Sequence, residues 1–215
     1  MSLPAAPTTI ARLRDALQRP LPGLPAQMQM APAPRPGTMS VSELDRDCRR
    51  AGVLVLLYPR GGELCLVLTR RTESLDSHRG QISFPGGGLH AGESPRQAAL
   101  REAEEELGVS AAMLDLLGEL SPIYIPPSDF CVYPLVAFAA KRPDFVPNPR
   151  EVAEVIEAPV SHLLDPATRC EETWPWLDTS RCVPFYAIGE HKVWGATAMV
   201  LCELLTLMDD SRRFP

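Results

Sequence analysis

Two apolar runs in the first half of the chain predict a buried β-hairpin. They are Val53–Tyr58 and Leu64–Thr69, and aliphatic side chains make up most of both. Continuous apolar runs of this length, bounded by turn residues, are typical of buried strands. The segment between them, Pro59–Glu63, holds a Gly-Gly pair and is expected to reverse the chain.

The same pattern predicts further strands and a C-terminal helix. Strands are expected over 116–125 and 131–139. The segment Glu151–Ile156 fits either a strand or a helix, and we favour a strand. From about residue 196 to 208, apolar side chains recur every three or four residues, which predicts a helix whose common face includes Met199, Cys202, Leu205 and Met208.

A helix with defined ends is predicted in the middle of the chain. It follows a strand over 81–84 and a loop of glycines at 86–88. Ser94 can cap its first turn, which also accommodates Pro95, and Gly108 is expected to end it. Its buried stripe consists of residues three and four positions apart, namely Leu100, Ala103 and Leu107.

Proline content separates an N-terminal arm from the rest of the chain. The sequence has 23 prolines, and eight of them lie in the first 36 residues. We therefore divide the chain into a Pro-rich arm, 1–38, and a single domain, 39–215. A short helix is expected in the arm, capped by Thr8 or Thr9, with one apolar face formed by Ile10, Leu13 and Leu17.

The arm is interpreted as a docking segment, which suggests a homodimer. Its arginines at 12, 14 and 19 also resemble those of a transit peptide, and we favour docking. Directly after the arm, Ser40–Glu43 forms a capping box, which predicts a helix through about Arg50.

Composition and charge limit the partners. The 215 residues include 27 Asp and Glu against 21 Lys and Arg, which gives a formal charge of −6. This balance argues against binding to a nucleic-acid backbone or an anionic membrane surface. No apolar run approaches a membrane span and the first residues lack a secretion signal, so a cytoplasmic location is expected. The six cysteines lack zinc-site spacing and are expected to be reduced and mostly to fill space.

Three carboxylates on the central helix carry the candidate chemistry. Glu102, Glu105 and Glu106 lie on one face of it, away from the apolar stripe. They repel one another unless a cation lies between them, and Mg²⁺ prefers such oxygen ligands. Arg101 lies one turn before Glu105, and Glu93 lies on the loop that enters the helix, so both are expected to support the cluster. The alternative is a solvated acidic face.

The stretch from Gly87 to Val109 resembles the Nudix box, G-x5-E-x7-R-E-U-x-E-E-x-G-U, where U is an aliphatic residue. The chain is therefore similar to Nudix hydrolases. The resemblance implies an α/β/α sandwich around a mixed sheet, and hydrolysis of a nucleoside diphosphate linked to another group. It also implies Mg²⁺ or Mn²⁺ held by Glu102, Glu105 and Glu106, with Arg101 orienting them and Glu93 as a support or a further ligand.

Residues before the box resemble the coenzyme A pyrophosphatase branch of that family, L-T-x-R-[S/A]-x3-R-x3-G-x3-F-P-G-G. The matching segments are Leu68–Thr72 and Gly80–Gly87, although Thr72 replaces Ser or Ala and Asp76 replaces Arg. This resemblance implies hydrolysis of coenzyme A or its thioesters to 3′-phosphoadenosine 5′-phosphate and a 4′-phosphopantetheine species. The implied substrate-binding residues are Arg70, Arg71, Arg79, Gln81, Ser83 and Phe84.

The arginines suit such a substrate. Metal ions can neutralise a pyrophosphate, whereas guanidinium groups bind a separate 3′-phosphate through paired hydrogen bonds. The alternative is that these arginines form surface ion pairs with Glu73 and Asp76. The four histidines, at 78, 90, 162 and 191, share no spacing, and His78 and His90, which flank the candidate site in sequence, are interpreted as ordinary surface residues.

The expected reaction is in-line attack of an activated water on one phosphorus atom. The expected catalytic residues are Glu105, Glu106 and Arg101. The general base stays open among four residues, Glu105, Glu106, Glu151 and Glu154. Two other functions stay open as well: Nudix hydrolysis of ADP-ribose, a dinucleotide or a nucleoside triphosphate, and non-catalytic sensing of a nucleotide.

Overall fold

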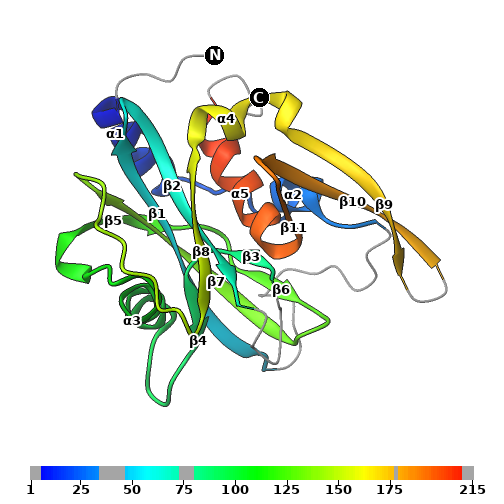
Figure 1. Cartoon of the computed structure of the whole chain (residues 1–215), viewed down its shortest axis with the longest axis horizontal. Helices are drawn as coiled ribbons and strands as arrows, with labels where there is room; N and C mark the ends of the chain where they lie inside the picture. The colour runs from blue at the N-terminus through cyan, green and yellow to red at the C-terminus, as the bar shows by residue number, and fades with distance from the viewer. Residues whose placement is uncertain (1–5, 34–46, 73–79, 177–178, 210–215) are drawn as a thin grey trace.

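An eight-stranded mixed sheet lies at the centre of the protein (Figure 1). The computed structural model describes residues 6–33, 47–72, 80–176 and 179–209. The strands follow the order β3-β2-β1-β7-β5, while β4, β6 and β8 pair with β1, β7 and β2. β1 and β7 run parallel, and the other pairs are antiparallel. The strand bounds are β1 Arg49–Arg60, β2 Glu63–Arg71, β3 Ile82–Ser83, β4 Gly86–Gly88, β5 Leu114–Glu119, β6 Ile123–Ile125, β7 Phe130–Ala139 and β8 Val152–Pro159.

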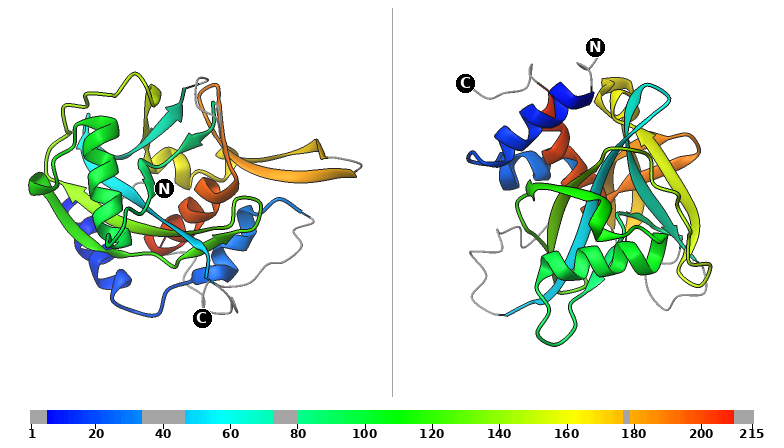
Figure 2. Two further views of the ribbon diagram at one scale, coloured as in Figure 1. Left: turned by 90° about the horizontal axis from the view of Figure 1, so that it is seen from below. Right: turned by 90° about the vertical axis from the view of Figure 1, so that its left-hand side faces the viewer.

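Helices cover both faces of this sheet (Figure 2). Helix α3 (Pro95–Leu107) lies on one side, and α1 (Ala6–Leu17) and α5 (Gly195–Met208) lie on the other. Alternate residues of β1 serve the two layers, because successive strand side chains point to opposite faces. Leu54 and Leu56 pack in the cluster beneath α3, whereas Val55 and Leu57 pack in the cluster that includes α5. This arrangement confirms the expected α/β/α sandwich.

The predicted hairpin is present, with a tighter turn than expected. β1 extends to Arg60, which pairs with Glu63 at the start of β2. Only Gly61 and Gly62 remain in the turn, with φ angles of +60° and +85°. Residues with a side chain rarely adopt two successive positive φ values, so the Gly-Gly pair defines this two-residue turn.

The other predicted elements are mostly confirmed. The strand favoured over Glu151–Ile156 is β8, and the C-terminal helix is α5. The strand expected over 116–125 is two strands, β5 and β6, with a register shift between Leu116 and Gly118. None of the described helices is long and apolar enough to cross a membrane. The remaining short helices are α2 Gly23–Gln27, η1 Met28–Met30, η3 Ala111–Met113, α4 Val160–Leu164 and η4 Pro166–Thr168.

The described part of the arm packs into the core. The predicted helix is α1, and its expected apolar face of Ile10, Leu13 and Leu17 is buried against the same cluster as α5. Beyond it, the fully buried Glu203 of α5 accepts hydrogen bonds from the Gly23 N–H at 3.0 Å and from Nε2 of Gln27 at 2.8 Å. A buried carboxylate requires such donors, so this contact fixes α2 against α5.

A second sheet of three strands was not predicted. It comprises β9 (Arg169–Trp176), β10 (Thr179–Ile188) and β11 (His191–Trp194), in the order β11-β10-β9. Its β10–β11 turn consists of Gly189 and Glu190, with Gly189 at a φ of +57°. A glycine-led pair of residues between two runs rich in apolar and aromatic residues is a hairpin signal, and it was present in the sequence.

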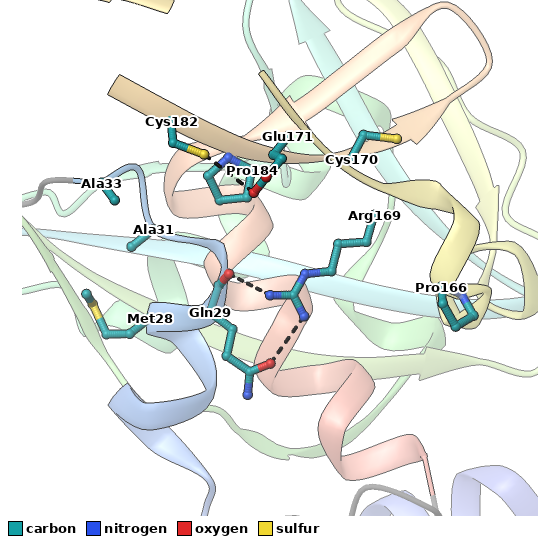
Figure 3. A pocket seen from close by; sticks show the side chains of 10 residues that line it. All are labelled: Met28, Gln29, Ala31, Ala33, Pro166, Arg169, Cys170, Glu171, Cys182 and Pro184. Carbon is teal, nitrogen blue, oxygen red and sulfur yellow. Dashed lines mark hydrogen bonds between the residues drawn. The ribbon is translucent and has the colours of Figure 1, made fainter. Parts of the chain in front are cut away.

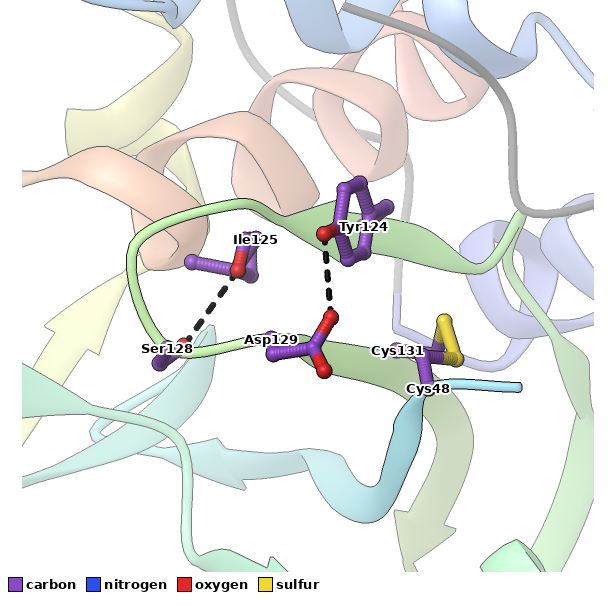
Figure 4. The surroundings of a disulfide bond; sticks show 6 residues. All are labelled: Cys48, Tyr124, Ile125, Ser128, Asp129 and Cys131. Carbon is purple, nitrogen blue, oxygen red and sulfur yellow. Dashed lines mark hydrogen bonds between the residues drawn. A yellow bond between two sulfur atoms is a disulfide. The ribbon is translucent and has the colours of Figure 1, made fainter. Parts of the chain in front are cut away.

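Two predictions near Cys48 are wrong. The helix expected through about Arg50 gives way to a strand, because Arg49 and Arg50 pair with Phe130 and Cys131 of β7; residues 40–46 lie outside the described part. The cysteines are not all reduced, because Cys48 and Cys131 form a disulfide with a Cα–Cα distance of 5.9 Å (Figure 4). Pairing of β1 with β7 brings the two residues together from 83 positions apart.

Candidate active site

Helix α3 is fixed at both ends and along its buried face. Ser94 and Gln97 form a capping box, in which the Gln97 N–H donates to Oγ of Ser94 at 3.3 Å and Oε1 of Gln97 accepts from the Ser94 N–H at 2.9 Å. Gly108 ends the helix at a φ of +69°. At Gly52 of β1, a side chain would overlap the Pro95 carbonyl. The predicted helix boundaries are therefore confirmed, and its carboxylates have a defined position.

Arg101 connects three carboxylates, of which the sequence predicted the contact with Glu105. Its guanidinium donates to both oxygens of Glu93, at 2.8 and 3.0 Å. It also donates to Glu102 at 2.8 Å, to Glu105 at 3.0 Å and to the Gly88 carbonyl at 3.1 Å. Its hydrogen bonds, together with the His90 N–H, lower the pKa of Glu93 to about 2. Arg101 thus holds the first half of α3 against the loop that precedes it.

A second group of carboxylates lies together near the C-terminal end of α3. Glu102, Glu106 and Glu151 each place one oxygen within 4.8 Å of the others. Glu151 enters from the loop before β8, where Nδ2 of Asn148 donates to its Oε1 at 3.1 Å. The Asn148 N–H in turn donates to the Glu106 carbonyl at 2.9 Å, which ties that loop to α3. Glu105 is not in this group, and its side chain is 51% exposed.

Glu106 is the most buried member of the cluster. Burial raises its pKa to about 8, opposed by Arg71, whose Nη1 lies 3.8 Å from Oε1. Its Oε2 is buried and has no hydrogen-bond partner among the described residues. A buried carboxylate oxygen with no donor, beside two more carboxylates, has the chemistry of a hard divalent cation site. The residues present therefore fit Mg²⁺ or Mn²⁺.

The glycine loop makes room for this cluster. A side chain at Gly87 of β4 would overlap the Glu102 carboxylate. β4 is fixed by pairing with β1, in the register Gly52↔Gly87. The absence of a side chain at this position is therefore what allows Glu102 to lie against the loop.

The implied substrate-binding residues fall into different environments. Arg71 contacts Glu106, whereas Arg70 pairs with Glu154 of β8 at 3.0 Å. Ser83 lies opposite Thr69 in β3, and Gln81 accepts from the Arg71 N–H through its carbonyl at 3.0 Å. Phe84 is 3% exposed and belongs to the core. Three further residues of the sequence argument, Glu73, Asp76 and Arg79, lie outside the described part.

A separate cavity of about 530 Å³ lies between the arm and the second sheet (Figure 3). Its lining includes Met28, Arg169, Cys170 and Cys182 but none of the implied site residues. Arg169 donates to the carbonyl and to Oε1 of Gln29, at 2.7 and 3.2 Å. The guanidinium of this cavity is thus already used to hold the arm, and its carboxylate, that of Glu171, accepts from Sγ of Cys182.

Comparison with known proteins identifies the family. The family model described as NUDIX domain matches residues 49–178, which contain the whole carboxylate site. The chain belongs to the Nudix hydrolase family. Members of this family hydrolyse phosphorus-containing anhydrides and generally use divalent metal ions, which agrees with the carboxylate cluster.

Similar Nudix hydrolases occur in bacteria, animals and plants. The chain is 33% identical to NudL of Photorhabdus laumondii over 83% of this chain and 91% of that protein. It is 31% identical to Nudix hydrolase 3 of Caenorhabditis elegans, over 77% and 76%. The chloroplastic Nudix hydrolase 22 of Arabidopsis thaliana is 32% identical over 74% of this chain, which spans only 55% of that relative.

A solved structure supports the fold alone. The MutT/nudix family protein from Enterococcus faecalis has a TM-score of 0.50 and 18% identity, over 75% of this chain and 62% of that chain.

The sequence did not place two residues, Glu151 and His191. Glu151 was only one of four candidates for the base, because nothing in a loop sequence shows where the loop docks. His191 was given no role because the four histidines share no spacing, yet its Nε2 lies 3.0 Å from Oε1 of Glu154. The Gly189-Glu190 turn would have indicated the strand that carries it.

Replacing Gly87 with alanine is expected to weaken Mn²⁺ binding and to lower kcat by about tenfold to a hundredfold, because the new methyl group displaces Glu102. Calorimetric titration with Mn²⁺ and steady-state kinetics measure the two effects. Gly88→Ala is the matched control, since its new methyl group would lie 3.9 Å from its nearest neighbours. Equal Mn²⁺ affinity in Gly87→Ala and the unaltered protein would contradict this role.

Proposed function

We propose that this Nudix hydrolase cleaves the pyrophosphate of coenzyme A or its thioesters, giving 3′-phosphoadenosine 5′-phosphate and a 4′-phosphopantetheine species. The observation that carries the proposal is an arginine beside the carboxylate cluster, with a second arginine next to it on the same strand. Arg71 lies 3.8 Å from Glu106, and Arg70 precedes it on β2. A substrate whose pyrophosphate lies at the carboxylates can therefore offer a further phosphate to a guanidinium group.

Each residue of the site has a separate role in the proposed reaction. Glu102, Glu106 and Glu151 would hold a divalent ion, which would supply positive charge to the pyrophosphate and lower the pKa of the attacking water. Glu105 is half-exposed and bonded to Arg101 through one oxygen, so it is our candidate to accept the proton of that water. Arg101 orients Glu102 and Glu105. Glu93 supports Arg101, which occupies both of its oxygens.

Incubation with coenzyme A and Mg²⁺ or Mn²⁺, followed by chromatography, tests the proposal. The expected result is equal amounts of 3′-phosphoadenosine 5′-phosphate and 4′-phosphopantetheine. A panel with ADP-ribose, a dinucleoside polyphosphate and nucleoside triphosphates compares kcat/KM under the same conditions. The proposal fails if a preparation that binds Mn²⁺ leaves coenzyme A intact, or if it prefers another member of the panel.

A further inference from the structure

Glu154 of β8 contacts both Arg70 and a histidine of the second sheet, and it thereby fixes the position of Arg70. Arg70 on β2 lies opposite Glu154 on β8, and its Nε donates to Oε2 of that residue at 3.0 Å. The other oxygen, Oε1, lies 3.0 Å from Nε2 of His191. The side chains of Arg70, Glu154 and His191 are 32%, 40% and 24% exposed. The group is therefore ordered by its own contacts and is still within reach of a ligand.

The histidine comes from outside the segment that matches the family. That match ends at residue 178, whereas β11 begins at His191. β11 packs beside β3, and Oγ1 of Thr197 in α5 donates to the Ile82 carbonyl at 3.0 Å. Because Ile82 is the strand partner of Arg70, the C-terminal part of the chain is fixed against the same stretch of β2.

The position of Arg70 suits a group of the substrate other than the scissile anhydride. Arg71 reaches the carboxylate cluster, whereas Arg70, the residue before it on β2, pairs with Glu154, and the register between β2 and β8 shifts between the two arginines. Arg70 therefore follows the same strand as Arg71 without belonging to that cluster. Among the described residues Glu154 is its hydrogen-bond partner, through Nε alone. A guanidinium fixed in this way keeps two terminal nitrogens for an anion, in the planar geometry that matches a phosphate.

Glu154 is well suited to orient that group. The hydrogen bond from Arg70, and a further one from His191, keep the pKa of Glu154 below its usual range. Its two oxygens have different partners, so contact with His191 sets the rotation of the carboxylate that Arg70 meets. Loss of His191 would leave this rotation, and with it the guanidinium, less defined.

We propose that His191 and Glu154 position Arg70 to bind a phosphate monoester of the substrate, separate from the pyrophosphate that is cleaved. This inference rests on the proposed function, in which the substrate carries such a phosphate. His191 and Glu154 act through Arg70, so both are positioning residues. The second sheet thereby contributes to substrate choice through β11, which lies beyond the matched residues 49–178.

The test compares coenzyme A with dephospho-coenzyme A, which lacks the 3′-phosphate. His191→Ala is expected to raise KM for coenzyme A about fivefold to tenfold, with kcat within about twofold and KM for dephospho-coenzyme A unchanged. His191→Gln keeps an N–H donor, so its KM for coenzyme A is expected to return most of the way to the value of the unaltered protein. The matched control is Lys192→Ala, since Lys192 of the same strand pairs with Glu172 at 2.7 Å and not with Glu154.

A merely structural role for His191 predicts a different result. An equal rise in KM for both substrates, or a fall in kcat alone, would overturn the inference. Calorimetric binding of adenosine 3′,5′-bisphosphate and adenosine 5′-monophosphate gives the same comparison without turnover. If coenzyme A is not cleaved but His191→Ala weakens the bisphosphate alone, the proposed function fails and the inference stands. If the protein does not prefer the bisphosphate, the inference fails by itself.

Discussion

Replacing Glu106 with glutamine is expected to lower kcat by about 1,000-fold while the protein stays folded. Glu106 is buried, one of its oxygens has no hydrogen-bond partner among the described residues, and two other carboxylates lie within 4.8 Å, so it is central to the proposed metal site. Loss of a ligand charge there removes several kcal/mol of transition-state stabilisation, which corresponds to about this factor. The measurement is kcat at saturating Mg²⁺, together with the rise in melting temperature that Mg²⁺ produces. That rise is expected to be much smaller in the variant.

The stability of Glu106→Gln without metal shows whether the fall in kcat comes from misfolding. Burial raises the pKa of Glu106 to about 8, so folding takes up a proton between the ordinary carboxyl pKa and that value. The metal-free parent therefore loses stability as pH rises towards 8, and a neutral glutamine removes this loss. Glu104→Gln, on the exposed side of the same helix, is the control and should keep full activity. If Glu106→Gln kept kcat within tenfold of the parent, Glu106 would not be a ligand in the reaction.

Loss of the Cys48–Cys131 disulfide is expected to lower the free energy of unfolding by about 3–4 kcal/mol. The bond joins residues 83 positions apart, and closing so long a loop in the unfolded chain removes much of its entropy. For a chain of this size the melting temperature should fall by roughly 10 °C. Denaturant unfolding of Cys48→Ala, and of the parent with and without reductant, measures the effect.

Thiol counts and a second variant check the origin of that effect. The unfolded chain should show four reactive thiols before reduction, from the free cysteines 65, 170, 182 and 202. Reductant should have no further effect on Cys48→Ala, and Cys182→Ser, at an exposed free cysteine, should unfold like the parent. Disulfides are typical of oxidising compartments, whereas the sequence predicts a cytoplasmic location. Six thiols in protein extracted without reductant would contradict the bond.

The sequence predicted those elements of the fold whose signals act within a few residues of the chain. The hairpin and α3 follow from apolar runs, a Gly-Gly turn and helix caps that act within a few residues. The helix expected through Arg50 failed because pairing of β1 with β7 overrides a cap signal that lies earlier in the chain. The disulfide was missed for a related reason, since residues 83 positions apart meet only when that pairing forms.

The candidate site also contains residues that local spacing predicted and residues that only tertiary packing places. Arg101 was expected to reach Glu105 one turn along the helix, and it does so at 3.0 Å, while its contact with Glu93 at 2.8 Å was not predicted. Glu151 and His191 reach the site by a docked loop and a separate sheet. Their positions depend on tertiary packing, so residue spacing could not have placed them.

The contact of the first helices with the last one has a consequence for synthesis. Gly23 and Gln27 meet Glu203 across 180 and 176 residues of sequence. Contacts of such high sequence separation form late in folding. The apolar face of α1 is therefore translated before α5, and its packing is complete only when α5 has been translated. Until then the nascent chain exposes part of that apolar face, and exposed apolar surface of this kind binds chaperones or aggregates.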